Sequence, residues 1–116
     1  MQYVCLVYHD MDVFLETYAG RMAELNRDSA AYDAELERQG LMVLAHALKP
    51  CAEAQVVRRR GGKTLRVDGP FAETKEELIG FIVVEAASLE QAIQIGAQIP
   101  LARSGTVVVR ETFSPA

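Results

Sequence analysis

Runs of hydrophobic residues with little polar interruption predict the strands of this chain. Residues 2–8 are almost wholly apolar, which is typical of a central strand covered on both faces. Similar runs at 41–48 and 79–85, and a shorter one at 106–110, predict three more strands. Gly80, inside the 79–85 run, indicates a point where a neighbouring group approaches the backbone closely.

Two other stretches show the periodicity of helices. Between residues 12 and 39 the apolar side chains recur every three, four or seven positions, which predicts one long amphipathic helix or two abutting helices. We expect Asp12 to cap the start of this stretch and Gly40 to end it in the left-handed conformation. Ser88 and Gln91 form a capping-box pattern, so a short helix is expected from Leu89 to about Gln98.

A β-hairpin is predicted in the middle of the chain. Residues 54–60 and 63–68 are rich in β-forming side chains and flank Gly61-Gly62, a pair suited to a tight turn with positive φ at both positions. The turn sets Arg60 opposite Lys63. The basic side chains of the hairpin, Arg58, Arg59, Arg60, Lys63 and Arg66, are therefore expected to be divided between its two faces.

The order of these elements is β-α-β-β-β-α-β, without a linker or an internal repeat. It predicts one α+β domain over residues 1–116, of the ferredoxin-like type with an extra β-hairpin. Helices would cover one face of the sheet and leave the other apolar face open. A second copy is the simplest cover, so we expect a homodimer in which two sheets form a closed α+β barrel around a shared cavity, a natural place for a small-molecule ligand.

Composition and charge narrow the class of protein further. Half of the 116 residues are hydrophobic, enough for one core, and the net charge of −4 argues against a nucleic-acid-binding surface. The first ten residues have no basic leader, and their apolar run is too short to span a membrane, so we expect a cytoplasmic protein without a membrane partner. Cys5 and Cys51 are expected to be free thiols. The cysteines and histidines lack metal-ligand spacing, so neither a metal nor another cofactor is expected.

The segment from Asp68 to Glu76, DGPFAETKE, carries the most distinctive chemistry. A Gly-Pro turn fixes the backbone, Phe71 offers an apolar anchor, and four charged side chains follow or precede it within nine residues. Loops held between rigid strands are common places for binding residues. Asp68 is accordingly a candidate for a catalytic acid or base, or alternatively a turn residue whose carboxylate accepts backbone N–H groups.

This segment resembles the signature of the DGPF group of YCII-related proteins, without a gap. The similarity extends over nearly the whole chain and includes the opening strand that ends in Tyr8, the Ala47-to-Pro50 segment and the approach through Arg103 and Gly105 to Arg110. It implies a ferredoxin-like fold, a dimeric α+β barrel and a cleft near the DGPF loop, but no settled activity. Where that group often has glycine after the first-strand tyrosine, this chain has His9. The His-Asp pair credited to related proteins does not map here by motif, so neither histidine inherits a catalytic role.

The candidate ligand-binding residues are those able to hold an anion or to line the expected cleft. Lys75 and Arg110 would bind a carboxylate or similar group, Glu73 would orient the lysine, and His46 would face the barrel interior. Phe71 would be a stacking surface, or alternatively a plug that packs the loop on the core. His9 and Asp10 would cooperate only if the first strand ends between them.

Two classes of function follow from these residues. The first is an enzyme, or a former enzyme, that binds a small anionic molecule beside the DGPF loop and uses acid-base chemistry. The alternative is a non-catalytic regulatory or protein-interaction module. Whether the chain is an enzyme stays open at the level of sequence.

Overall fold

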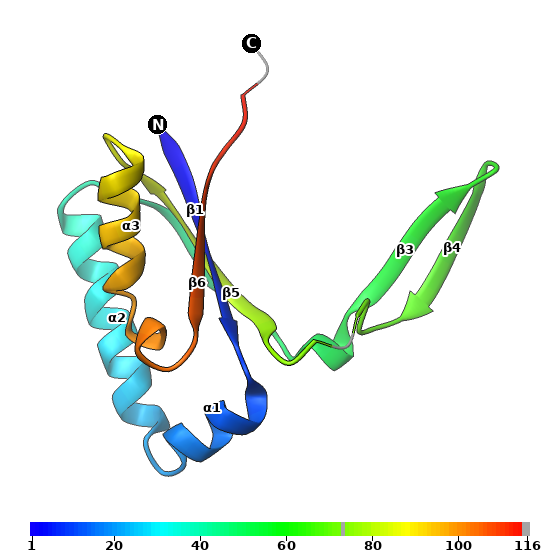
Figure 1. The fold of residues 1–116 in the computed structure, drawn as a ribbon, viewed down its shortest axis with the longest axis horizontal. Helices are drawn as coiled ribbons and strands as arrows, with labels where there is room; N and C mark the ends of the chain where they lie inside the picture. The colour runs from blue at the N-terminus through cyan, green and yellow to red at the C-terminus, as the bar shows by residue number, and fades with distance from the viewer. Residues whose placement is uncertain (73, 115–116) are drawn as a thin grey trace.

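A computed structural model describes residues 1–72 and 74–114 and shows a helix-covered sheet with a separate β-hairpin (Figure 1). Two short 3-10 turns, η1 (Cys51–Glu53) and η2 (Pro100–Arg103), join the main elements. In chain order those elements are β1 (Gln2–His9), α1 (Met11–Tyr18), α2 (Met22–Arg38), β2 (Met42–Ala47), β3 (Gln55–Arg60), β4 (Lys63–Asp68), β5 (Glu77–Glu85), α3 (Leu89–Ala97) and β6 (Thr106–Glu111).

The main sheet has four antiparallel strands in the order β2-β5-β1-β6. Strand β5 lies between β2 and β1, and β1 lies between β5 and β6. Two β-α-β units therefore interleave, as the sequence order predicted. The α+β class is confirmed. Gly80 lies against β2 as expected, because a Cβ atom there would stand 3.0 Å from the carbonyl oxygen of His46.

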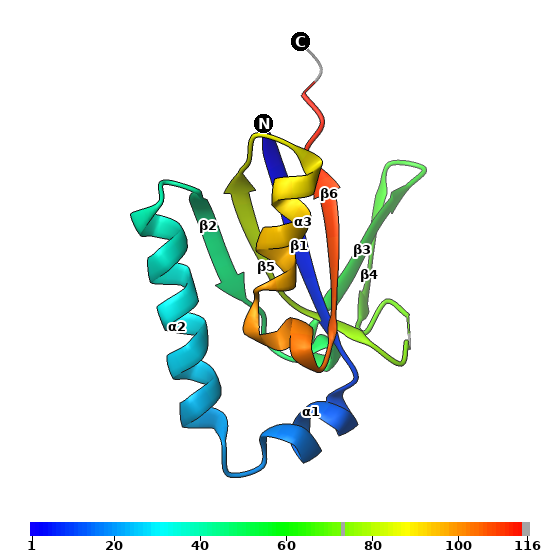
Figure 2. The same ribbon diagram turned by 60° about the vertical axis from the view of Figure 1, so that its left-hand side comes forward.

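The core lies between the sheet and its helices. Alternate residues of β1 and β5 point into it, since side chains of a strand alternate between faces. Tyr3, Cys5 and Val84 are almost completely buried there, and Leu36 of α2 packs against them. Helices α2 and α3 both lie on this one side of the sheet (Figure 2).

The opposite face of the sheet is open in a single chain. Its side chains are half-buried or exposed, among them Leu44 at 41% and Val108 at 38% exposure. The prediction that the first strand is covered on both faces is therefore wrong for the single chain. The open face carries Val4, Leu6 and Tyr8 of β1, Phe81 and Val83 of β5, Leu44 and His46 of β2, and Val108 and Arg110 of β6.

The periodic stretch after β1 forms two helices, because Gly20 turns the chain with a φ of 70°. Asp10, and not Asp12 as expected, caps α1: its carboxylate accepts hydrogen bonds from the main-chain N–H groups of Asp12 and Val13 at 3.0 and 3.2 Å. Strand β1 ends at His9, three residues before the predicted cap, so the helix begins earlier than expected. At α3 the capping pattern is confirmed, with the Gln91 N–H donating to Ser88 Oγ at 3.1 Å.

The hairpin formed by β3 and β4 has the predicted turn and register. Gly61 and Gly62 take φ values of 57° and 75°, and Arg60 lies opposite Lys63. The hairpin forms its own two-stranded sheet and stands away from the main sheet, on the side opposite the helices (Figures 1 and 2). No helix in the described ranges is long and apolar enough to cross a membrane.

Candidate functional site

The predicted site residues fall into two groups in the single chain. His46 and Arg110 both lie on the open face of the sheet, but β2 and β6 form its opposite edges. His46 packs edge-on against Phe81, with ring centroids 5.9 Å apart. These two residues are therefore on one surface without being neighbours.

The second group belongs to the hairpin and the segment that follows it. Asp68 ends β4, and its carboxylate accepts a hydrogen bond from Gln55 Nε2 at 2.9 Å. Phe71 is 74% exposed, with the Arg58 guanidinium 5.4 Å from its ring centroid. Lys75 is exposed, and Glu73 lies outside the described residues. One chain by itself does not bring Asp68 and Phe71 to His46 and Arg110.

The end of the DGPFAETKE segment returns to the body of the protein. The Thr106 hydroxyl donates to the Glu76 carboxylate at 3.0 Å, and Glu77 pairs with His9 across β5 and β1. The segment thus ends beside the last residue of β1 and the first residue of β6. A polar cluster lies at this point, inside the fold.

His9 is the centre of that cluster and is completely buried. Its Nε2 atom lies 2.8 Å from Ser104 Oγ, which in turn lies 2.7 Å from the Tyr18 hydroxyl. His9 Nδ1 lies 2.8 Å from the main-chain carbonyl oxygen of Asp10. Sequence reasoning considered His9 but missed Ser104 and Tyr18, which are 86 residues apart in the chain.

The carbonyl partner fixes where the protons lie. A carbonyl oxygen only accepts, so neutral His9 carries its proton on Nδ1 and donates it to Asp10. Nε2 is then an acceptor, and Ser104 donates its hydroxyl proton to it. Tyr18 completes the chain by donating to Ser104 Oγ. Each hydroxyl can reverse its direction, so the chain is able to carry a proton toward His9 or away from it.

Local structure holds the His9 ring in place. The end of β1 and the cap at Asp10 turn the chain into α1, whose Phe14 ring packs edge-on against His9 with centroids 5.4 Å apart. Gly105 also lies against the ring, since a Cβ atom there would stand 2.8 Å from His9 Cδ2. The glycine after Ser104 was the sequence signal that a neighbour approaches closely here.

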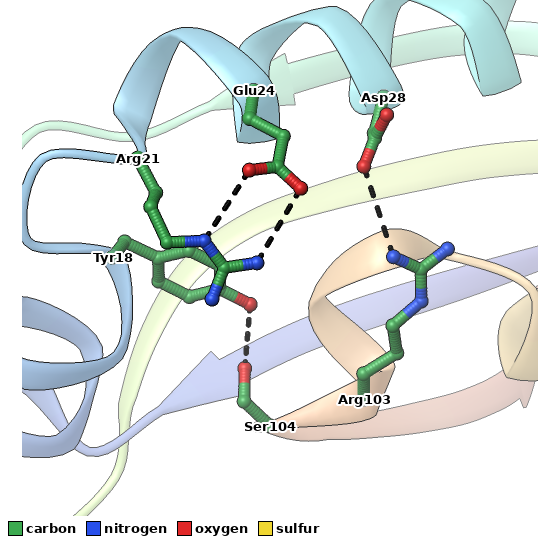
Figure 3. Close-up of polar contacts among 6 residues, drawn as sticks. All are labelled: Tyr18, Arg21, Glu24, Asp28, Arg103 and Ser104. Atoms are coloured by element: carbon green, nitrogen blue, oxygen red, sulfur yellow. Dashed lines mark hydrogen bonds and ion pairs between the residues drawn. The ribbon is translucent and has the colours of Figure 1, made fainter.

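A pocket of about 210 Å³ opens beside Tyr18 and Ser104. Two arginines and two carboxylates stand at its rim (Figure 3). Arg21 Nε binds Glu24 Oε2 at 3.3 Å, and this pair lowers the pKa of Glu24 while it raises that of Arg21. Arg103 Nη1 lies 3.7 Å from Asp28 Oδ2 and its side chain is 73% exposed. The hydroxyl groups of Tyr18 and Ser104 and the exposed guanidinium groups therefore line one pocket.

The geometry at Ser104 favours proton transfer over attack by its oxygen on an acyl group. Acyl transfer needs N–H donors aimed at a developing oxyanion. The main-chain N–H groups of Ser104 and Gly105 are both already bound to the Leu101 carbonyl oxygen, at 3.3 and 2.7 Å. What the cluster offers is a buried imidazole connected to a pocket by hydroxyl groups, the arrangement of a general acid or base.

The structure brings together no cluster of three or more histidine, cysteine, aspartate or glutamate side chains able to hold a metal within residues 1–72 and 74–114. Cys5 is buried and Cys51 half-buried, both as free thiols. A second pocket, at the foot of the hairpin, is lined by Lys49, Cys51, Glu53 and neighbouring apolar residues. The start of the DGPF segment contacts this cleft, because the Gly69 N–H donates to the carbonyl oxygen of Ala54, one of its lining residues.

Comparison with known proteins places this sequence in a family. Residues 1–114 match the YCII-related domain. A protein of Rhizobium meliloti (strain 1021), named Uncharacterized protein R00369, is 32% identical over 106 residues, which cover 91% of this chain and 86% of that protein. A match over nearly the whole length, to both the domain and the relative, means that the chain belongs to the YCII-related domain family.

Proposed function

We propose that this protein binds a small anionic molecule in the pocket beside Ser104 and exchanges a proton with it through Ser104 and His9. The supporting observation is the unbroken hydrogen-bond chain from a fully buried imidazole to the hydroxyl groups at the pocket. Imidazole is the side chain best suited to proton exchange near neutral pH. The site lies close to the end of the DGPF segment, because Thr106, two residues after Ser104, donates to the Glu76 carboxylate.

The arginines at the rim favour a negatively charged ligand. Arg103 and Asp28 are 3.7 Å apart, with side chains 73% and 42% exposed, and ion pairs this open to solvent contribute little free energy. A ligand carboxylate or phosphate is able to replace Asp28 as the partner of Arg103 at small cost. Guanidinium groups suit this exchange because they bind carboxylate and phosphate oxygens with two parallel hydrogen bonds.

The proton path is short and balanced. A ligand that releases a proton to Ser104 Oγ lets Ser104 pass its own hydroxyl proton to His9 Nε2, so the ligand loses one proton and His9 becomes imidazolium. His9 Nδ1 keeps its own proton throughout and donates it to the Asp10 carbonyl oxygen. The reverse sequence returns the proton. Because His9 is completely buried, Ser104 is a necessary intermediate in either direction.

Ligand binding can be tested by thermal-shift screening of small carboxylates and inorganic phosphate against wild type, Arg103→Gln and Arg21→Gln. Arg38→Gln is a matched control for Arg21→Gln. Arg21, at the start of α2, pairs with Glu24, and Arg38, at the end of α2, pairs with Glu35, each three positions away. We expect an anion that stabilises wild type and Arg38→Gln and stabilises the two pocket variants less. Equal stabilisation of all four proteins would place the anion site elsewhere.

Proton exchange can be tested by calorimetry of the same anion in buffers of different ionisation enthalpy. Wild type is expected to take up or release a proton on binding, and His9→Asn to bind with a smaller proton change. A proton change unaltered by His9→Asn contradicts the role of His9, whether or not the anion still binds.

The dimer expected from the sequence is proposed on a separate observation. The open sheet face carries apolar side chains from all four strands, and at ~25 cal/mol per Å² their burial against a second copy would offset the cost of association. Val108 on this face and Val13 on α1 have similar exposures, 38% and 40%. We expect Val108→Lys to weaken a dimer seen by light scattering and Val13→Lys to leave it unchanged. A monomeric wild type would contradict both the dimer and a closed barrel.

A further inference from the structure

The β3–β4 hairpin has two chemically different faces. On one face Gln55 donates to Asp68, Arg66 donates to the Gln55 oxygen, and Arg59 donates to Thr64, so its polar groups bind one another. The other face carries Val56, Arg58, Arg60, Lys63, Leu65 and Val67. We call this second set the apolar-basic face.

Two of the three apolar side chains of this face are left uncovered. Leu65 is 47% and Val67 58% exposed, and Phe71, with Arg58 over its ring, is 74% exposed. These side chains lie together, because Leu65 is opposite Arg58 in the ladder and Arg58 lies over the Phe71 ring. Apolar side chains gathered on one exposed face mark a surface that binds a partner.

The hairpin also differs in charge from the rest of the chain. Residues 55–68 hold five basic side chains against one acidic, a net charge of +4. Of the chain's 12 basic and 16 acidic side chains, 7 and 15 remain outside the hairpin, a net charge of −8. A second copy of this chain therefore presents the acidic surface that a basic arm attracts.

We propose that the hairpin is an arm that lies on the body of a second copy of this chain, with its apolar-basic face against the partner. Figure 1 shows the arm standing off on the same side as the open sheet face, where a second copy would pack. A two-fold dimer would exchange two arms, one from each chain. The proposal rests on the dimer proposed above, and it adds that the arm holds the dimer together.

A nucleic-acid partner fits these observations less well. The five basic side chains are divided, with Arg59 and Arg66 on the polar face and Arg58, Arg60 and Lys63 on the other. The body behind them carries a net charge of −8, which repels phosphates. The arm thus suits an acidic, partly apolar protein surface.

Matched pairs of variants test the arm. Val67 and Val57 have similar exposures, 58% and 62%, but lie on opposite faces, as do Arg58 and Arg59. Val67→Ser and Arg58→Glu are each expected to raise the dimer dissociation constant, measured by analytical ultracentrifugation, about tenfold or more. Val57→Ser and Arg59→Glu should change it little, although they alter the composition and the net charge in the same way. Circular dichroism checks that all four variants are folded.

A second measurement locates the arm directly. In a dimer mixed from isotope-labelled and unlabelled chains, filtered NOE spectra are expected to connect the Leu65 and Val67 methyl groups to the unlabelled partner, and not the Val57 methyl groups. A dimeric wild type that lacks these contacts, with equal dissociation constants for all four variants, overturns the arm and leaves the dimer intact. A monomeric wild type overturns both proposals.

Discussion

Gly105 lies against the ring of His9, so close that the position has no room for a side chain. A Cβ atom there would stand 2.8 Å from His9 Cδ2 and 2.4 Å from the Tyr8 carbonyl oxygen, which belongs to the β1 backbone. We expect Gly105→Ala to lower the free energy of unfolding by about 2 kcal/mol or more, because backbone and a buried ring must both shift. Urea unfolding measures this loss.

Gly96→Ala is the control for that substitution. A Cβ atom at Gly96 meets side-chain methyl groups of Val109 and Val107, at 3.1 and 3.3 Å, which are able to move. Alanine is also more favourable than glycine in a helix such as α3, by about 1 kcal/mol. The free energy of unfolding of Gly96→Ala is therefore expected to stay close to that of wild type. An equal loss for both variants would show that the contact of Gly105 with His9 is not what makes Gly105→Ala destabilising.

Ser104→Ala is expected to break the hydrogen-bond chain at its centre. His9 Nε2 would lose its donor and Tyr18 its acceptor, so the free energy of unfolding should fall by about 1–3 kcal/mol. Tyr18→Phe removes one link only and should cost less. Nitrogen NMR of His9 provides a readout that stability does not: the Nδ1–H tautomer should be found in wild type and in both variants, since the Asp10 carbonyl still holds it. A proton on Nε2 in neutral wild type would contradict the proposed direction of the chain.

Local signals in the sequence predicted most of the fold. The Gly61-Gly62 turn set the hairpin register, the Ser88–Gln91 pattern set the start of α3, and the apolar runs gave each strand to within a few residues. Where the first helix begins was misjudged, because Asp10 and Asp12 are both suitable caps and only the end of β1 at His9 decides between them.

The candidate site was far harder to predict. His9, Tyr18 and Ser104 come from β1, α1 and the loop after η2, and their meeting depends on the packing of β1 beside β6. No spacing in the sequence encodes that contact. The DGPFAETKE segment stood out in sequence because it is local, yet in the single chain its first residues lie on the hairpin, away from the buried cluster.

The stability of the protein in acid should depend on Glu35. Hydrogen bonds from Arg38 and then from Gln39 lower the pKa of Glu35 to about 2 from its usual 4.5. A depressed pKa contributes stability above the unfolded value, and this contribution is lost as the pH falls from about 4.5 toward 2. Wild type should therefore exceed Glu35→Gln in stability near neutral pH, and the difference should shrink over that interval.

Tyr32 should make the stability of the protein depend on pH in the alkaline range. Burial, with smaller effects of Cys5 and Asp33, raises the pKa of Tyr32 to about 12, and its hydroxyl donates to the Ile95 carbonyl oxygen at 2.7 Å. A raised pKa contributes stability that is complete below the unfolded value of 10 and is lost as the pH rises through 12. Tyr32→Phe should cost about 1 kcal/mol at neutral pH, since the carbonyl loses its donor. Unfolding measured from neutral pH to pH 12 should show the two proteins converging at the alkaline end.

Asp68 remains the test of the DGPF segment itself. Its carboxylate accepts from Gln55 Nε2 on an exposed part of the hairpin, and the side-chain oxygen of asparagine is able to accept the same bond. Asp68→Asn should therefore melt within a few degrees of wild type, while the charge and the ability to take up a proton are lost. If Asp68 serves a ligand, the anion found by screening will stabilise Asp68→Asn less than wild type, and Lys75→Ala will behave in the same way. If all three proteins respond equally, or if Asp68→Asn chiefly unfolds, the segment is structural and the buried His9 cluster is left as the place where chemistry occurs.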